Sequence, residues 1–351
     1  MSTLYVDRND VTLELEGGAL QLRVAGERLQ TVPVRLLERV VLRADTRLTS
    51  GVLAGLADMG VGVLALGGRG GQRVAHILGA PNNDARVRIA QCQMLGDEVF
   101  AIAWSRQIVR AKLRQQHRVI VGALSVRLDL RKPLCDARDT LALSLERLGG
   151  AADRAAVRGL EGGAAAAYFR GFKRLFPESL EFEGRRRRPP PDPVNACLSL
   201  GYTLLHSQAV RACWAAGLDP MVGFLHMPLH GRASMACDLM EPWRALVDRW
   251  VWAQFRERAL RGEHFGRDGA GACLLAKAGR AHFYSAWTPL QQQLTVALRR
   301  QARLCARRLA DAAVVPADDE FDLDDAAAGF ELTGNGTTSF TDVAQLHAGQ
   351  P

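Results

Sequence analysis

The chain has 351 residues, of which 48% are hydrophobic and 23% charged. This composition is ordinary for a soluble globular protein, and the length allows one large or two medium domains. The net charge of +8 at pH 7 favours an anionic partner, although an arginine bias from a GC-rich genome explains the charge equally well.

The composition also excludes several classes of protein. The N-terminus lacks the basic and apolar blocks of a secretion signal, and the most apolar window, residues 51–68, is interrupted by Asp58 and several glycines. It therefore reads as a buried helix followed by a strand, not as a membrane span. The seven cysteines include no CxxC pair, which argues against a structural zinc site. We expect a cytoplasmic protein with free thiols.

The first eighty residues have the period of β-strands. Apolar residues alternate with polar ones from Val11 to Val24, and Gly17-Gly18 interrupts the alternation, which predicts a hairpin. Strands are also predicted within 32–44, 61–68 and 73–78, with a short helix capped by Ser50 between the first two. The segment GGRGG (67–71) lacks the GK[ST] ending of a phosphate-binding loop, so it predicts a turn. These elements indicate a β-rich domain over residues 1–80.

After GAPNND (79–84) the apolar period changes from two to about 3.6, which predicts a helical domain over residues 85–310. One long first helix is expected over 84–116, and others over 136–150 and 151–176. RRRRPPPDP (185–193) predicts a basic, proline-rich loop. Asp192 is the expected N-cap of the next helix, with Pro193 in its first turn. Residues 311–351 are acidic and aperiodic, which predicts a disordered tail.

The stretch GFLHMPLHGRASMACDLMEPWR (223–244) carries the strongest candidates for chemistry. If a helix begins near Ser234, Asp238 and Glu241 share one of its faces. They then form either surface ion pairs, with Arg244 and Asp248 continuing the series, or part of a metal site with His226. Carboxylates with an imidazole suit Mn²⁺ and tolerate Mg²⁺. His226 is equally compatible with a core or capping role, and His230 competes for the role of ligand.

A second candidate acid lies in the helical stretch RGLEGGAAAAYF. Gly162, Gly163 and the alanines predict close approach of another backbone, so Glu161 needs a partner, which is either a bound cation or Arg158. Further along the chain, a polar stripe at helical spacing either lines a wet cleft or faces solvent; it consists of Asn195, Ser199, Tyr202 and His206.

Four motifs in order, EGGAAAAYF, DPVNACLSLGY, GLDP..GFLH and S..CDLMEPWR, give the chain a family resemblance. Over roughly residues 1 to 300 it resembles the CRISPR-associated spacer-acquisition endonuclease, the integrase subunit of the adaptation complex. The resemblance implies an α+β fold, with a small β-sandwich-like N-terminal domain that dimerises and a larger all-α catalytic domain. It also implies a homodimer, a small companion protein and a captured DNA duplex as partners.

The resemblance further implies a metal site for Mg²⁺ or Mn²⁺ formed by Glu161, His226 and Glu241, with Asp238 as a fourth catalytic residue. The implied reaction inserts short DNA fragments into the CRISPR array by attack of a 3′-hydroxyl on a phosphodiester, and water in its place gives nuclease activity. The alternative is a DNA-binding scaffold whose metal site is idle. DNA contacts are predicted for Arg185, Arg186, Arg187, Arg188, Asn195, Tyr202 and Arg244.

Overall fold

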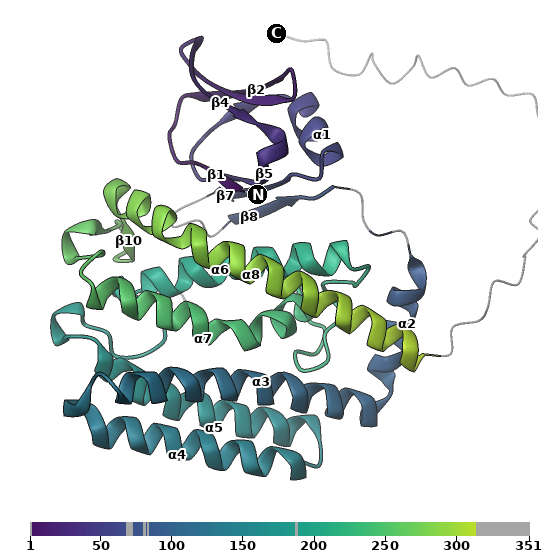
Figure 1. The fold of residues 1–351 in the computed structure, drawn as a ribbon, viewed down its shortest axis with the longest axis vertical. Coiled ribbons are helices and arrows are strands. Elements are labelled where there is room, and N and C mark those ends of the chain that lie inside the picture. The colour runs from purple at the N-terminus through teal and green to yellow at the C-terminus, as the bar shows by residue number, and fades with distance from the viewer. Residues whose placement is uncertain (1, 68–72, 80–81, 83, 187–188, 314–351) are drawn as a thin grey trace, which may run out of the picture. The chain divides into compact units, whose positions relative to one another are not determined.

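The computed structural model describes residues 2–67, 73–79, 82, 84–186 and 189–313. Strands occupy the N-terminal part and helices most of the remainder (Figure 1). The predicted α+β fold is confirmed. Within the described part of the chain, the strand region and the helical region belong to one compact unit. The division into domains near residue 80 stays a prediction.

The predicted hairpin forms the centre of the first sheet. In it Leu13 pairs with Leu22, and Gly17 and Gly18 turn the chain with φ of 57° and 73°, a conformation that suits glycine. The four strands lie in the order β4-β3-β2-β6. They are β2 (Val11–Glu16), β3 (Ala19–Val24), β4 (Glu27–Pro33) and β6 (Arg47–Leu48).

The second sheet has the order β1-β5-β7-β8, with β1, β5 and β7 parallel and β8 antiparallel to β7. Its strands are β1 (Ser2–Val6), β5 (Leu37–Leu42), β7 (Gly62–Gly67) and β8 (Arg73–Ile77). Helix α1 (Ser50–Asp58) lies between β5 and β7 in the chain; its cap is Thr49, whose side chain accepts from the Val52 N–H, and not Ser50 as expected. Leu13 and Leu20 share one core with Val40 and Val63, so the two sheets pack as a sandwich.

The helices that follow the second sheet form two groups in Figure 1. Helix α3 contacts α4, α5 and α7, and α6 contacts α7 and α8. The helices are α2 (Ala85–Gly96), α3 (Glu98–Leu124), α4 (Arg131–Arg147), α5 (Arg154–Phe172), α6 (Pro193–Ala215), α7 (Ser234–Arg256) and α8 (Lys277–Ala312). The 3₁₀ turns are η1 (Val34–Leu36), η3 (Leu128–Leu130), η4 (Leu148–Gly150), η5 (Lys173–Leu175), η6 (Glu178–Leu180) and η7 (Gly262–His264).

Three expectations for this region need correction. The long first helix is two helices, because the Asp97 carboxylate accepts from the Phe100 N–H and starts α3 afresh. The helical region also contains a small antiparallel pair, β9 (Phe265–Arg267) and β10 (Cys273–Leu275), so it is not entirely α-helical. Finally, α8 continues to Ala312, past the predicted start of the tail. The rest of the predicted tail and residues 68–71 of the predicted GGRGG turn lie outside the described residues.

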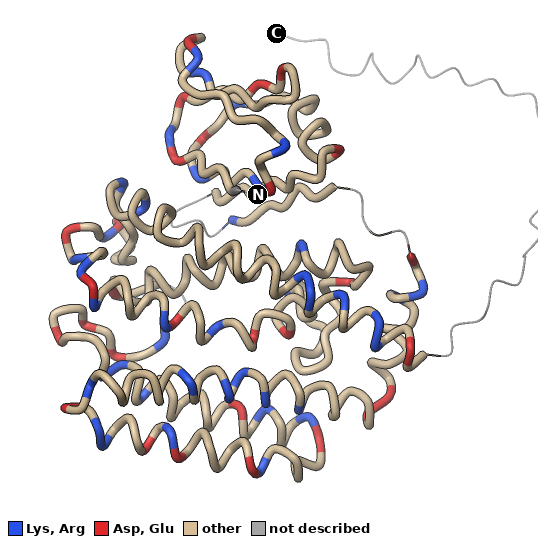
Figure 2. The backbone as a smooth tube through the Cα atoms, viewed as in Figure 1, with Lys and Arg blue, Asp and Glu red and all other residues tan. Residues whose placement is uncertain are grey.

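Polar contacts join the strand region to the helices. Arg211 of α6 donates to the backbone carbonyls of Glu38 and Gly60, and Arg299 of α8 pairs with the Glu38 carboxylate at 2.8 Å. Lys and Arg are interspersed with Asp and Glu over both regions (Figure 2). Among the described residues, no helix has the length and apolarity to cross a membrane.

Candidate metal and DNA site

Asp238 is a buried acid that holds the loop before α7 in place. Its side chain is completely buried, and its carboxylate accepts hydrogen bonds from the backbone N–H groups of Phe224, Leu225 and His226 at 2.7, 3.0 and 2.9 Å. A Cβ on Gly223 would lie 2.6 Å from the Ser234 carbonyl carbon, so only glycine lets this loop approach the start of α7. Asp238 therefore anchors the GFLH segment to its own helix.

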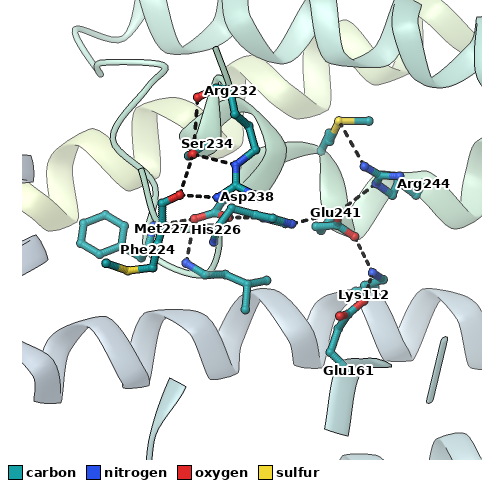
Figure 3. A network of polar contacts seen from close by, with 12 residues as sticks. Lys112, Glu161, Phe224, His226, Met227, Arg232, Ser234, Asp238, Glu241 and Arg244 are labelled. Carbon is teal, nitrogen blue, oxygen red and sulfur yellow. Dashed lines mark hydrogen bonds and ion pairs between the residues drawn. The ribbon is translucent and has the colours of Figure 1, made fainter. Parts of the chain in front are cut away.

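The same carboxylate orients His226. His226 Nδ1 lies 2.7 Å from Asp238 Oδ1, and an ionised carboxylate can only accept, so Nδ1 carries the proton. In the neutral tautomer with this proton the lone pair is on Nε2, which points toward Glu241 and lies 3.9 Å from its Oε1 (Figure 3). This arrangement, with one ring nitrogen held by a carboxylate and the other left available, is usual for histidines that bind metal. The competing His230 is exposed.

Glu241 faces two cations. Its side chain is 4% exposed, and its carboxylate lies 2.6 Å from Lys112 Nζ and 2.9 Å from Arg244 Nε. Burial acts to raise the pKa of Glu241, but Arg244 and Lys112 outweigh burial and lower this pKa to about 2. Glu241 is therefore ionised throughout the physiological range.

Glu161 of α5 joins Glu241 through the same lysine. Lys112 Nζ donates to Glu161 Oε1 as well as pairing with Glu241 (Figure 3), whereas Arg158 is exposed. Burial acts to lower the pKa of Lys112, but Glu241 and Glu161 together raise it, so the ammonium is charged. The predicted close approach at Gly162 and Gly163 is wrong, because a Cβ added at either glycine would have no described atom outside the helix backbone within 4 Å.

Lys112 was not predicted from the sequence as a member of the site. It lies on the buried face of α3 together with Val109, Leu113 and Gln116. A lysine at a position of this apolar period was the available signal, because a buried ammonium requires acidic partners. Which acids would face it could not be read from local spacing, since α3, α5 and α7 meet only in the folded chain.

The donor set fits a divalent metal ion. Two carboxylates and one oriented imidazole nitrogen converge from α5, α7 and the preceding loop, the mixture that suits Mn²⁺ and is acceptable to Mg²⁺. Lys112 Nζ lies between the two carboxylates, and in this arrangement no group of three or more His, Cys, Asp or Glu side chains among the described residues is close enough to hold a metal. Metal binding therefore requires the side chains to rearrange around Lys112.

The sequence also allowed a solvent-exposed face of α7 with ion pairs, and only part of this prediction is confirmed. The Glu241–Arg244 pair forms, but Asp238, Glu241 and Asp248 are all buried. Asp248 accepts from the hydroxyls of Tyr168 and Tyr202. Burial raises the pKa of Asp248 to about 6, against the opposing effect of the two hydroxyls and Arg244.

The predicted DNA contacts include buried residues. The carboxamide of Asn195 is used within the protein: it accepts from Arg185 and the Arg186 N–H and donates to Asp192 and the Gly184 carbonyl. Asn195 is fully buried and Tyr202 nearly so, so the polar stripe does not face solvent at these positions. Arg186 is exposed. Arg187 and Arg188 lie outside the described residues.

Arg244 connects the stripe to the carboxylates. Its guanidinium lies 4.8 Å from the centre of the Tyr202 ring while its Nε pairs with Glu241. Arg185 lies 5.3 Å from the same ring and donates to Ser199 Oγ at 3.2 Å. The basic loop and the acidic site are therefore joined through one aromatic ring.

Sequence comparison places the chain in a family. The profile of the family described as CRISPR associated protein Cas1 matches residues 4–289. A CRISPR-associated endonuclease Cas1 from Thermodesulfovibrio yellowstonii is 34% identical over 322 residues, which cover 88% of this chain and 97% of the relative. The chain therefore belongs to the Cas1 family.

Solved structures have the same fold. A Cas1 protein from Thermotoga maritima is 19% identical with a TM-score of 0.78, covering 91% of this chain and 100% of that one. A casposase bound to integration product is 20% identical with a TM-score of 0.76, covering 90% and 92%. A Cas6-RT-Cas1–Cas2 complex contains a chain 24% identical with a TM-score of 0.72, covering 88% of this chain and 35% of that one.

Proposed function

We propose that the chain is a metal-dependent DNA integrase and endonuclease of CRISPR adaptation. One observation supports the proposal beyond family membership: Lys112 joins Glu161 to Glu241, His226 Nε2 lies 3.9 Å from Glu241 Oε1, and Asp238 fixes the orientation of the imidazole. An acid pair with an oriented histidine has the donors that a metal-dependent phosphodiester enzyme requires.

When bound, a divalent metal ion supplies Lewis acidity at the phosphodiester and neutralises charge that develops in the transition state. Glu161, Glu241 and His226 Nε2 would hold it. Asp238 keeps the Nδ1 proton of His226 in place, so that Nε2 stays available. The 3′-hydroxyl of an incoming DNA end attacks the target phosphorus and a 3′-hydroxyl of the target leaves. One phosphodiester replaces another, so the chemical step needs no ATP.

The partners follow from the same proposal. Double-stranded DNA is the substrate, and exposed arginines such as Arg186 would bind its phosphates. Such binding weakens steeply as salt is added. A homodimer and a small companion protein are proposed from the family resemblance, and a cytoplasmic location from the seven cysteines without a CxxC pair. The solved Cas1–Cas2 complex of similar fold supports the companion protein.

The test is strand transfer on a branched DNA that mimics a half-integrated end, with Mn²⁺, Mg²⁺ or EDTA. We expect metal-dependent resealing of the branch by the wild type and its loss in Glu241→Ala. The matched control is Glu257→Ala, which removes an exposed carboxylate directly after the same helix and is expected to retain activity. Tight binding of the branch without resealing in either metal would instead support a DNA-binding scaffold.

A further inference from the structure

Lys112 is a buried lysine placed between the two acids of the proposed metal site. Its side chain is 11% exposed, and the rest of its face of α3 is mostly apolar. Burial of an ammonium in such a place is unfavourable unless acids compensate it. Both compensating acids, Glu161 and Glu241, are the carboxylates that would hold the metal.

The charges of the four groups balance. Lys112 and Arg244 are positive, Glu161 and Glu241 are negative, so the set is neutral as it stands. Among the described residues, Lys112 is the one cation with contacts to both carboxylates. Of the two carboxylates, Arg244 pairs with Glu241, and its guanidinium also lies 4.8 Å from the centre of the Tyr202 ring.

A divalent ion and this ammonium compete for the same place. A Mg²⁺ or Mn²⁺ ion held by Glu161 and Glu241 would take the carboxylate oxygen atoms that Lys112 Nζ contacts in this structure. Two cations cannot share that space, and their mutual repulsion in a buried site is large. The flexible four-carbon stem of lysine allows its ammonium to move away, which a rigid guanidinium would do less readily.

We propose that Lys112 is the exchangeable counter-ion of this site. In the metal-free protein its ammonium neutralises Glu161 and Glu241 and holds them together, and metal binding displaces it. The inference rests on the metal site of the proposed function. Lys112 then has two opposing effects. It lowers the affinity of the site for metal, and it keeps the two carboxylates in place before metal binds.

The wild-type chain permits a direct test, because it contains only four lysines, Lys112, Lys132, Lys173 and Lys277. An amine-acylating reagent, with peptide mass spectrometry, reports the reactivity of each. Lys112 is buried and paired, whereas Lys132 is exposed. Without metal we therefore expect Lys112 to react at least about tenfold more slowly than Lys132. Saturating Mn²⁺ should raise the rate at Lys112 about fivefold or more and leave the other three unchanged.

A matched pair of variants gives a second test. Isothermal titration should show that Lys112→Met binds Mn²⁺ about tenfold or more tightly than the wild type, because the competing charge is gone. Lys132→Met, which removes a surface lysine, should bind as the wild type does. If Lys112→Met does not fold, as judged by circular dichroism, the labelling of the wild-type protein decides.

The outcomes separate this inference from the proposed function. If Mn²⁺ binds the wild type but not Glu241→Ala, and Lys112 reactivity is unchanged or lower with metal, the inference is overturned and the metal site stands. Equal or weaker Mn²⁺ binding by folded Lys112→Met overturns it in the same way. If the wild type and Glu241→Ala bind Mn²⁺ equally, the metal site is absent and both proposals fall.

Discussion

The site has two halves, built on one helix, that differ in what surrounds each acid. Asp238 and Glu241 are three residues apart on α7, and both are buried. Asp238 accepts from three backbone N–H groups and from the imidazole N–H of His226. Glu241 faces the side-chain cations Lys112 and Arg244. Burial alone therefore does not distinguish an acid that supports the fold from one that can take part in chemistry. The partners of the carboxylate make this distinction.

The contrast has a physical basis. Backbone donors are held by the loop and cannot leave Asp238 without unfolding it, so that half of the site is part of the folded framework. The ammonium of Lys112 at Glu241 is the end of a long, flexible side chain that can exchange for another positive charge. We therefore expect substitutions in the first half to reduce stability, and substitutions in the second to reduce metal binding and catalysis.

Asp238→Ala tests this contrast with the largest expected effect. It leaves three backbone N–H groups and the His226 ring N–H without their acceptor in a buried place. We expect the free energy of unfolding to fall by about 4 kcal/mol in urea titrations. A fall below about 1 kcal/mol would show that water or neighbouring groups replace the carboxylate, and the two halves would then be equivalent.

Glu241→Gln should reduce metal binding more than it reduces stability, the reverse of what is expected for Asp238→Ala. The amide keeps the size of the side chain but loses the charge that a metal ion and Lys112 require. We expect Mn²⁺ affinity to fall about 100-fold, equivalent to about 2.7 kcal/mol, with a smaller loss in the free energy of unfolding. Calorimetric titration with Mn²⁺ measures the first quantity. A variant that binds Mn²⁺ normally would remove Glu241 from the site.

Asp248 is an intermediate case, since its partners are two tyrosine hydroxyls. Its pKa is raised from 3.8 to about 6 in the folded protein, so the folded state binds this proton more tightly than the unfolded state does. The free energy of unfolding should therefore fall as pH rises from about 4 to about 6, by about 2 kcal/mol, and level off above that range. Urea titrations across this range should show a smaller fall in Asp248→Asn. Equal pH dependence in both proteins would contradict the assignment.

His226→Asn separates the two nitrogens of the ring, with the smallest expected effect. The asparagine amide can replace the Nδ1–H that faces Asp238, but it offers nothing in place of Nε2. We expect a change below about 1 kcal/mol in the free energy of unfolding, and about tenfold weaker Mn²⁺ binding, or about 1.4 kcal/mol. Large destabilisation would mean that the whole ring, and not only Nδ1–H, supports the loop.

Local signals in the sequence were sufficient for much of the fold. The hairpin over 11–24 is confirmed because alternation and a Gly-Gly turn act over a few residues. The start of α6 is confirmed because Asp192 caps it and Pro193 follows. The break at Asp97 carried the same kind of capping signal, but the continuous helical period on both sides concealed it.

The site was less predictable, because its contacts are long-range. Spacing could not rank His226 against His230; the geometry does, since the loop folds back so that the N–H groups before and at His226 reach Asp238. The sequence predicts a bound cation or Arg158 of the same helix as the partner of Glu161, whereas the structure shows Lys112, 49 residues earlier in the chain. Such pairs depend on how α3, α5 and α7 pack, which no local pattern specifies.

Pro242 follows Glu241 directly inside α7. Proline has no N–H, so it cannot donate to the carbonyl of Asp238, and its ring crowds that carbonyl. The helix thus lacks a bond at the turn that contains both acids. In mechanical terms, the turn of α7 that joins the two halves of the site lacks one of the bonds that stiffen a helix, so it resists bending less than a regular turn does.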